Sequence, residues 1–139
     1  MQVLVDTSVW SVGLRRKRGQ LSGAEESHRA ELAELIQEAR VRMIGPIRQE
    51  LLSGIREEAQ YARLRQFLRA FRDETMATED YEAAARLSNQ SRARGISGSA
   101  TDFLICAVAV RRHWHIFTRD EDFTRYKAVI PVVLHSPRA

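Results

Sequence analysis

The chain of 139 residues is poor in cysteine, and its apolar runs are short. Its one cysteine, Cys106, lies inside the apolar run 103–108, where we expect a small buried side chain and neither a nucleophile nor half of a disulfide. No apolar segment approaches the roughly 20 residues that a membrane span requires, and the N-terminus lacks the basic region and apolar stretch of a signal peptide. These absences predict a soluble, cytoplasmic protein without membrane contacts.

Lysine is also scarce. Only Lys17 and Lys127 are lysines, so 20 of the 22 basic side chains are arginine, and the 18 acidic residues leave a net charge of +4. The planar guanidinium group suits bidentate contacts with phosphate, which would fit a polyanionic partner. Solvated helix faces explain the same composition equally well. The basic run at 15–18 predicts a solvated loop near the site described below.

The four histidines do not have the spacing of a metal site, and the chain contains no internal repeat, low-complexity segment or linker. A chain of this length can bury about two-thirds of its unfolded surface, which is enough for a core without disulfides or structural metals. We therefore expect one domain over residues 1–139.

Apolar strand patterns alternate with helical patterns along the chain. The strand patterns fall at residues 3–5, 41–44, 114–118 and 131–134, with a short edge strand at 74–77. Helical spacing falls at residues 9–14, 23–40, 46–52, 57–71, 78–94 and 102–112, and a short helix follows Asp122. This alternation predicts a three-layer α/β/α fold with a central, mostly parallel sheet of four to five strands.

Several residues mark the expected helix ends. Ser22 and Glu25 form a capping box, Pro46 is suited to the first position of its helix, and Thr78 is suited to an N-cap. Gly95 is placed to end the helix that begins there. Of these helices, the one around residues 103–110 is apolar nearly all round and should be buried, whereas the one over 57–71 has an arginine-rich face and could contribute to a dimer.

The first strand, residues 3–5, has no polar alternation and ends on a carboxylate, Asp6. Such strands are typical of parallel sheets that are buried on both faces, and ligands bind at the carboxyl ends of those strands. Thr7 and Ser8 can hydrogen-bond a carboxylate or the turning backbone. Taken alone, however, Asp6 is better explained as a turn residue or as the cap of the next helix.

Three more acids are expected at the same edge of the sheet. Asp120 follows a strand as Asp6 does, and Glu50 and Asp102 begin helices that lead away from that edge. Alone, Glu50 is most simply an exposed helix residue, and Asp102 is equally well explained by the helix dipole. Together, carboxylates about 4 Å apart would repel by roughly 4 kcal/mol per pair at an effective dielectric constant near 20. Four convergent acids therefore predict a bound Mg²⁺ or Mn²⁺, which can activate water for phosphodiester cleavage.

Four segments in this order resemble PIN-domain ribonucleases, specifically the VapC-type toxins of bacterial toxin–antitoxin pairs. They are residues 5–8 (VDTS), 48–54 (RQELLSG), 99–105 (SATDFLI) and 118–123 (TRDEDF). The resemblance spans nearly the whole chain. It has two departures, because Cys106 stands where many relatives carry alanine and the polar run at 97–99 predicts a flexible approach to Asp102.

The resemblance implies a PIN fold and a metal-dependent endoribonuclease that acts as a toxin. The acidic quartet that binds Mg²⁺ or Mn²⁺ would be Asp6, Glu50, Asp102 and Asp120. Ser8 and Thr118 would be supporting polar residues, and Asp122 would be either a fifth acid or a charge at a helix N-terminus. The implied partners are an RNA substrate, a second copy of the chain, an antitoxin whose tail blocks the acidic groove, and operator DNA through the antitoxin alone.

Two other interpretations are open from the sequence. A receiver domain has the same alternation of strands and helices, and it uses the aspartate after its first strand as a phospho-acceptor. Receivers also need an adjacent acidic pair at that point and a lysine after a late strand, whereas Asp6 is alone and Lys127 precedes the final predicted strand. The second alternative is a PIN-like interaction module without catalytic activity, which would not bind Mn²⁺.

Overall fold

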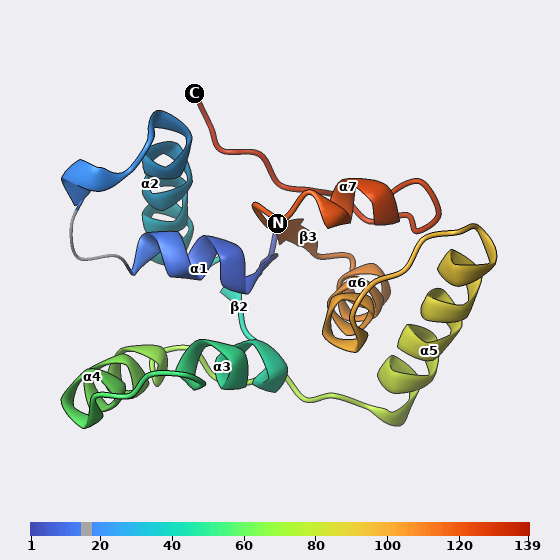
Figure 1. Ribbon diagram of the computed structural model, residues 1–139, viewed down its shortest axis with the longest axis horizontal. Helices are drawn as coiled ribbons and strands as arrows, with labels where there is room; N and C mark the ends of the chain where they lie inside the picture. Colours follow the sequence, from blue (N-terminus) through green and yellow to red (C-terminus); the bar gives the residue numbers. More distant parts are fainter. Residues whose placement is uncertain (15–17) are drawn as a thin grey trace.

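A computed structural model describes residues 1–14 and 18–139, so most of the predicted basic loop at 15–18 lies outside the described residues (Figure 1). The strands are β1 (Val3–Val5), β2 (Val41–Arg42) and β3 (His115–Phe117). The helices are α1 (Thr7–Gly13), α2 (Gly23–Gln37), α3 (Gly45–Leu52), α4 (Glu58–Leu68), α5 (Thr78–Ala93), α6 (Ala100–Arg112) and α7 (Asp122–Tyr126), with a 3₁₀ turn η1 (Arg18–Gln20) before α2.

The three strands form a parallel sheet in the order β2-β1-β3, and Val3 pairs with both Val41 and His115. All three residues of β1 have 0% exposure. Because neighbouring residues of a strand point to opposite faces, both faces of β1 are covered, as in the predicted three-layer arrangement. The carboxyl ends of β1 and β3 lie side by side in this sheet.

The sheet has three strands and not the predicted four to five. Two of the predicted strands are reduced to single bridges, one between Asp73 and Met43 and one between Leu134 and Ile116. Both bridges are parallel and lie at the outer edges of the sheet. The topology therefore keeps five positions, but the two outermost hold no regular strand among the described residues.

Local chemistry explains both short edges. Beside β2, backbone groups of the predicted strand 74–77 are bonded to side chains instead of to a neighbouring strand. The Thr75 carbonyl accepts from Arg112 Nη2 at 2.9 Å, and the Ala77 N–H donates to Asp80 Oδ2 at 2.8 Å. Beside β3, Pro131 has no N–H and the Val132 N–H donates to the nearby Ile130 carbonyl at 2.8 Å, so the pairing with β3 is confined to the backbone of Ile116.

Most of the predicted helix signals are confirmed. The Ser22 hydroxyl accepts from the Glu25 N–H at 3.1 Å, and the Glu25 carboxylate accepts from the Ser22 N–H at 3.0 Å, which completes the capping box. Gly95 follows α5 with a φ of 78°. Ala39 has a φ of 57°, and α2 ends at Gln37, before the predicted residue 40.

Two predicted helix starts are displaced by one residue. Pro46 is the second residue of α3, which begins at Gly45. Ala77, and not Thr78, is the N-cap of α5. An alanine can take this position because the Asp80 carboxylate accepts the N–H of the cap residue, so no hydroxyl is needed there.

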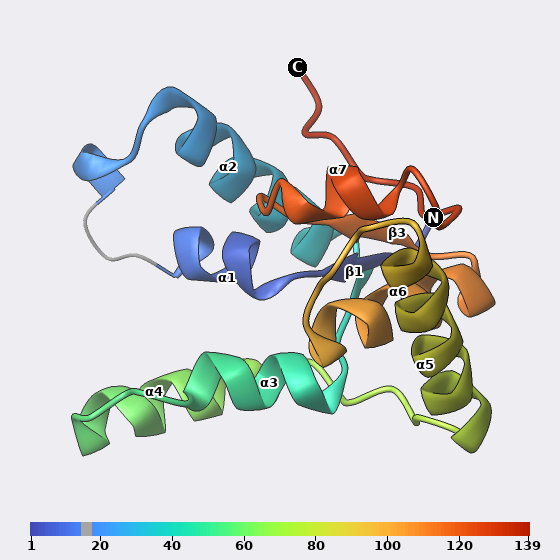
Figure 2. The same cartoon turned by 45° about the vertical axis from the view of Figure 1, so that its right-hand side comes forward.

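The helices pack in two main pairs. α1 packs on α2, and α5 packs on α6, to the left and right of the strands in Figures 1 and 2. α3 packs on α4, and this pair runs along the bottom of both views. Residues 103–109 of α6 are all buried, which confirms the prediction of a helix that is apolar nearly all round. Among the described residues, no helix combines the length and the hydropathy needed to span a membrane.

Candidate metal centre

Asp6 is held at the point where β1 ends and α1 begins. Its backbone N–H donates to the Phe117 carbonyl of β3 at 2.9 Å, and its carbonyl accepts from the Val9 N–H at 3.0 Å. Asp6 occupies the N-cap position of α1, but its side chain makes no capping bond to this fully described helix. The residue is only 7% exposed. Asp6 therefore caps α1 through its backbone and not through its side chain, so helix capping does not explain the buried carboxylate.

Two hydroxyl groups hold one oxygen of this carboxylate. Ser8 Oγ and Thr118 Oγ1 both donate to Asp6 Oδ2, each at 2.8 Å. Each hydroxyl in turn accepts a backbone N–H, from Arg119 to Ser8 at 2.9 Å and from Asp120 to Thr118 at 3.0 Å. Both side-chain bonds end on Oδ2. Within the part of the chain that the structure describes, Oδ1 is the oxygen available to a cation.

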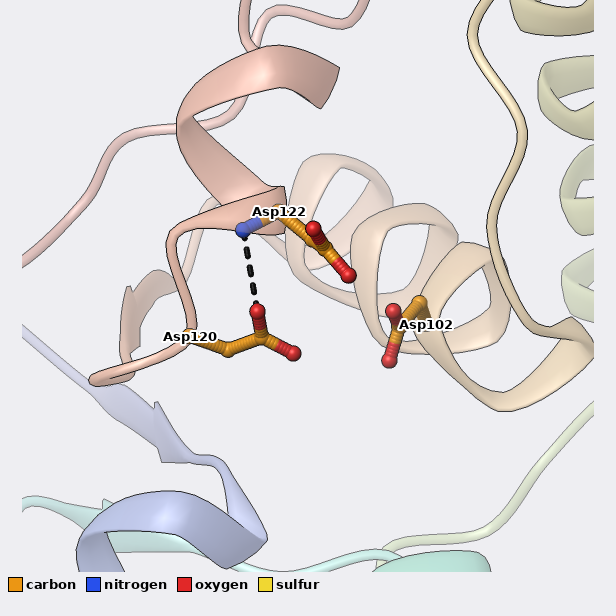
Figure 3. Close-up of side chains that lie close together, drawn as sticks. All are labelled: Asp102, Asp120 and Asp122. Carbon is orange, nitrogen blue, oxygen red and sulfur yellow. Dashed lines mark hydrogen bonds between the residues drawn. The ribbon is translucent and has the colours of Figure 1, made fainter.

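Asp102 of α6, Asp120 of the turn after β3 and Asp122 at the start of α7 point toward one another (Figure 3). One carboxylate oxygen from each lies within 4.8 Å of the others. The turn is fixed by the Asp122 N–H, which donates to Asp120 Oδ1 at 2.9 Å (Figure 3). Asp102 is fixed by Ser99, whose hydroxyl accepts the Asp102 N–H at 3.0 Å and caps α6.

Asp102 also has a side-chain partner that the sequence analysis missed. The Tyr126 hydroxyl donates to Asp102 Oδ2 at 2.6 Å. Burial, together with the hydrogen bond to Asp102 and its negative charge, raises the pKa of Tyr126, so this hydroxyl keeps its proton and remains a donor. The two residues are 24 positions apart, and no motif in the sequence connects them.

The acids act on one another electrostatically. Burial, followed by the negative charges of Asp6 and Asp120, raises the pKa of Asp102, although the Tyr126 hydrogen bond opposes this change. Glu50 is exposed as a residue, but partial desolvation of its carboxyl group, followed by the charges of Asp6 and Asp102, raises the pKa of Glu50 as well. A divalent cation would remove this repulsion.

The structure places the predicted site residues at different distances from one another. Asp102, Asp120 and Asp122 form the close acidic cluster, which among the described residues includes neither Asp6 nor Glu50. Asp6 lies at the buried side of the site, and its negative charge helps to raise the pKa of Asp102. Glu50 lies on the exposed face of α3 at the rim.

The donor set fits a hard divalent cation. The cluster offers only carboxylate oxygens, the ligands that Mg²⁺ and Mn²⁺ prefer. Cys106 is one turn of α6 beyond Asp102 and does not change this chemistry, because it is 0% exposed and burial raises the pKa of its thiol to about 12. A neutral, buried thiol is a poor metal ligand.

Comparison with known proteins gives the family, since residues 3–129 match the PIN domain model. The chain belongs to the PIN-domain family. Among its relatives, this PIN domain is 32% identical over 123 residues to "Ribonuclease VapC11" of Mycobacterium tuberculosis and to "VapC ribonuclease Mb1587" of Mycobacterium bovis. Each match covers 87% of this chain and 88% of the relative.

Solved structures share the fold of this PIN domain. FitAcB from Neisseria gonorrhoeae superposes with a TM-score of 0.76 at 23% identity, over 98% of each chain. VapBC2 from Rickettsia felis, bound to a promoter DNA fragment, gives a TM-score of 0.76 at 14% identity, over 97% of this chain and 98% of that one. The predicted PIN fold is confirmed, and the receiver-domain interpretation is wrong.

Proposed function

We propose that this PIN domain is a metal-dependent endoribonuclease and acts as the toxin of a toxin–antitoxin pair. The observation that carries the proposal is the convergence of three carboxylates within 4.8 Å beside the buried Asp6, at the carboxyl edge of a parallel sheet. Mutually repelling acids at this edge are costly for a fold unless they serve a cation. The relatives at 32% identity are named as VapC ribonucleases, which supports RNA cleavage as the reaction.

The residues divide into ligands and supporting groups. Asp6, Glu50, Asp102 and Asp120 would hold Mg²⁺ or Mn²⁺, and Asp122, which lies in the close cluster with Asp102 and Asp120, would be a fifth acid. When bound, such a cation lowers the pKa of a coordinated water and offsets negative charge at the scissile phosphate. Ser8 and Thr118 orient Asp6 through the hydrogen bonds to Oδ2. Glu50, at the exposed rim, adds charge where RNA and solvent can enter.

The biological setting is proposed from the same relationship. The Rickettsia felis neighbour is named VapBC2 and was solved with a DNA fragment from its promoter. We expect this chain to bind a cognate antitoxin in the cytoplasm, to reach operator DNA only through it, and to form a homodimer. The exposed apolar side chain of Phe67 on α4, at 44%, offers surface for such contacts. We also propose that residues 1–139 form one domain, because strands and helices from both ends of the chain share one core.

Expression in bacteria tests the toxin role. The wild-type chain should arrest growth and produce new RNA ends in total RNA, and Asp6→Asn should do neither at an equal protein level. Glu82→Gln, an exposed acid on α5, is the matched control and should arrest growth like the wild type. Co-expression of a small protein encoded immediately upstream should restore growth. Growth arrest by Asp6→Asn, or arrest without RNA cleavage, would contradict the proposal.

A further inference from the structure

Tyr126 connects the aromatic core to the acidic site. Its side chain is fully buried, and its ring packs against Phe103 and Phe123, with centroids 5.2 Å away in both cases. The ring planes are inclined by 45° to Phe103 and 76° to Phe123, so Tyr126 is enclosed on two sides. In a close-packed interior this fixes where the hydroxyl lies. The hydroxyl lies 2.6 Å from Asp102 Oδ2.

Gly98 makes room for this hydroxyl. A Cβ at position 98 would lie 2.3 Å from the Tyr126 hydroxyl oxygen and 2.7 Å from Cζ, distances at which something must move. Among the described residues, the glycines with positive φ are Gly54 and Gly95, so Gly98 is not required for backbone conformation. Glycine is required at position 98 because any side chain would collide with Tyr126. The run at 97–99, predicted to be a flexible approach, is thus in contact with Tyr126 through Gly98 and caps α6 through Ser99.

Asp102 and Asp6 are held in the same way, by hydrogen bonds from hydroxyl groups. In each carboxylate the Oδ2 atom accepts from a hydroxyl, Tyr126 for Asp102 and both Ser8 and Thr118 for Asp6. A carboxylate with one oxygen bonded in this way presents the other in a fixed direction. Partners that hydrogen-bond a metal ligand typically account for 10- to 100-fold of metal affinity.

We propose that Tyr126 is a positioning residue for the metal site: its hydroxyl fixes Asp102 for cation binding, and Gly98 keeps the space in which that hydroxyl lies. This inference rests on the proposed function, because it assumes that Asp102 is a metal ligand. It adds a contact from α7 and a contact from the loop before α6 that the acidic motifs do not contain.

The Tyr126→Phe variant tests the hydroxyl while keeping the buried ring. Isothermal titration calorimetry with Mn²⁺ should show a dissociation constant about 10- to 100-fold above that of the wild type. Thermal unfolding of the metal-free variant should change by only a few degrees, since the apolar packing is retained. Tyr81→Phe, which changes an exposed tyrosine on α5, should bind Mn²⁺ like the wild type. A Tyr126→Phe protein that unfolds more easily but binds Mn²⁺ normally would mean a structural role alone and would overturn the proposal.

Gly98→Ala tests the same contact from its other side. The added methyl group should displace the hydroxyl and weaken Mn²⁺ binding, whereas Ser97→Ala, at the neighbouring exposed position, should not. The Gly98→Ala/Tyr126→Phe double variant should bind Mn²⁺ about as tightly as whichever single variant binds it more weakly, because both substitutions remove the same hydrogen bond to Asp102. If the losses in affinity of the two single variants add in the double variant, Gly98 and Tyr126 do not act through the same hydrogen bond. Wild-type protein that binds no Mn²⁺ would overturn the metal site as well, whereas normal wild-type binding with unaffected variants would overturn this inference alone.

Discussion

The hydroxyl of Thr118 donates to Asp6 Oδ2 at 2.8 Å and thereby joins the ends of β3 and β1, which are 112 positions apart in the sequence. The same oxygen accepts from Ser8, and a backbone N–H supports each hydroxyl. Side chains of the protein itself therefore orient the Asp6 carboxylate. Such supporting contacts typically account for part of the affinity of a metal ligand.

Removing either hydroxyl should weaken metal binding without unfolding the protein. Ser8→Ala and Thr118→Val are each expected to raise the Mn²⁺ dissociation constant about 10-fold or more, because Asp6 loses a donor that fixes its Oδ2 atom. Calorimetric titration measures this effect. Ser11→Ala, an exposed serine on α1, is the matched control. Wild-type affinity in both site variants would show that the hydroxyls do not orient Asp6 for a metal.

Asp102→Asn should stabilise the metal-free protein. The change removes one of several repelling charges, and the amide oxygen can still accept from Tyr126. We expect a gain of about 1 kcal/mol, or about 3–6 °C in the midpoint of thermal unfolding. Addition of Mn²⁺ should reverse the order, because the cation stabilises only a protein that binds it.

The pH dependence of this gain has a defined sign. The pKa of Asp102 is raised in the folded protein, so its ionised form disfavours folding. The wild type has no such penalty below the ordinary aspartate pKa, and the penalty develops as pH rises through the raised folded pKa. The advantage of Asp102→Asn should therefore be small in acid and grow toward neutral pH. An advantage that shrinks as pH rises would contradict the repulsion.

Asp80 should be important for stability and not for catalysis. It is 0% exposed and accepts from Arg111 Nε at 3.0 Å and from Arg112 Nη1 at 2.8 Å, which ties the start of α5 to the end of α6. Asp80→Ala is expected to lower the free energy of unfolding by about 3 kcal/mol in a urea titration. Glu79→Ala, an exposed neighbour on α5, should change it by less than about 0.5 kcal/mol.

Acid should reduce the difference between wild type and Asp80→Ala. The hydrogen bond from Arg112 holds the pKa of Asp80 well below its usual range. Its contribution is therefore complete above the ordinary aspartate pKa and is lost as pH falls through the lower folded pKa. A difference that is constant through this acid range would contradict the ion pair as the source of the stability.

Part of this site can be predicted from the sequence with general rules for parallel sheets. Asp6 and Asp120 each follow a parallel strand, and the carboxyl ends of such strands share one edge. Asp102 lies in the first turn of a buried helix, whose direction is set by packing on the sheet. The side chain of Glu50 could not be placed in this way. Its direction depends on how α3 is rotated about its axis, and residue spacing does not determine that rotation.

Other features depend on contacts between distant segments. The edge strand predicted at 74–77 is absent from the described residues because Arg112, nearly 40 positions away, takes the Thr75 carbonyl. The contact between Tyr126 and Asp102 likewise requires the folded positions of α6 and α7. Single-sequence periodicity contains neither relationship, since both arise from tertiary packing.

The central claim is that these carboxylates bind a divalent cation with which the protein cleaves RNA. The most direct test is cleavage of total RNA by purified protein with Mn²⁺, with excess chelator, and after Mn²⁺ is restored, beside Asp102→Asn and Glu82→Gln. We predict cleavage with Mn²⁺, none with chelator, and recovery when Mn²⁺ is restored. Glu82→Gln should cleave like the wild type, and Asp102→Asn should be at least about 100-fold slower, since it loses a proposed ligand and not only a supporting contact. Cleavage that persists in chelator, or an Asp102→Asn protein as active as the wild type, would contradict the claim.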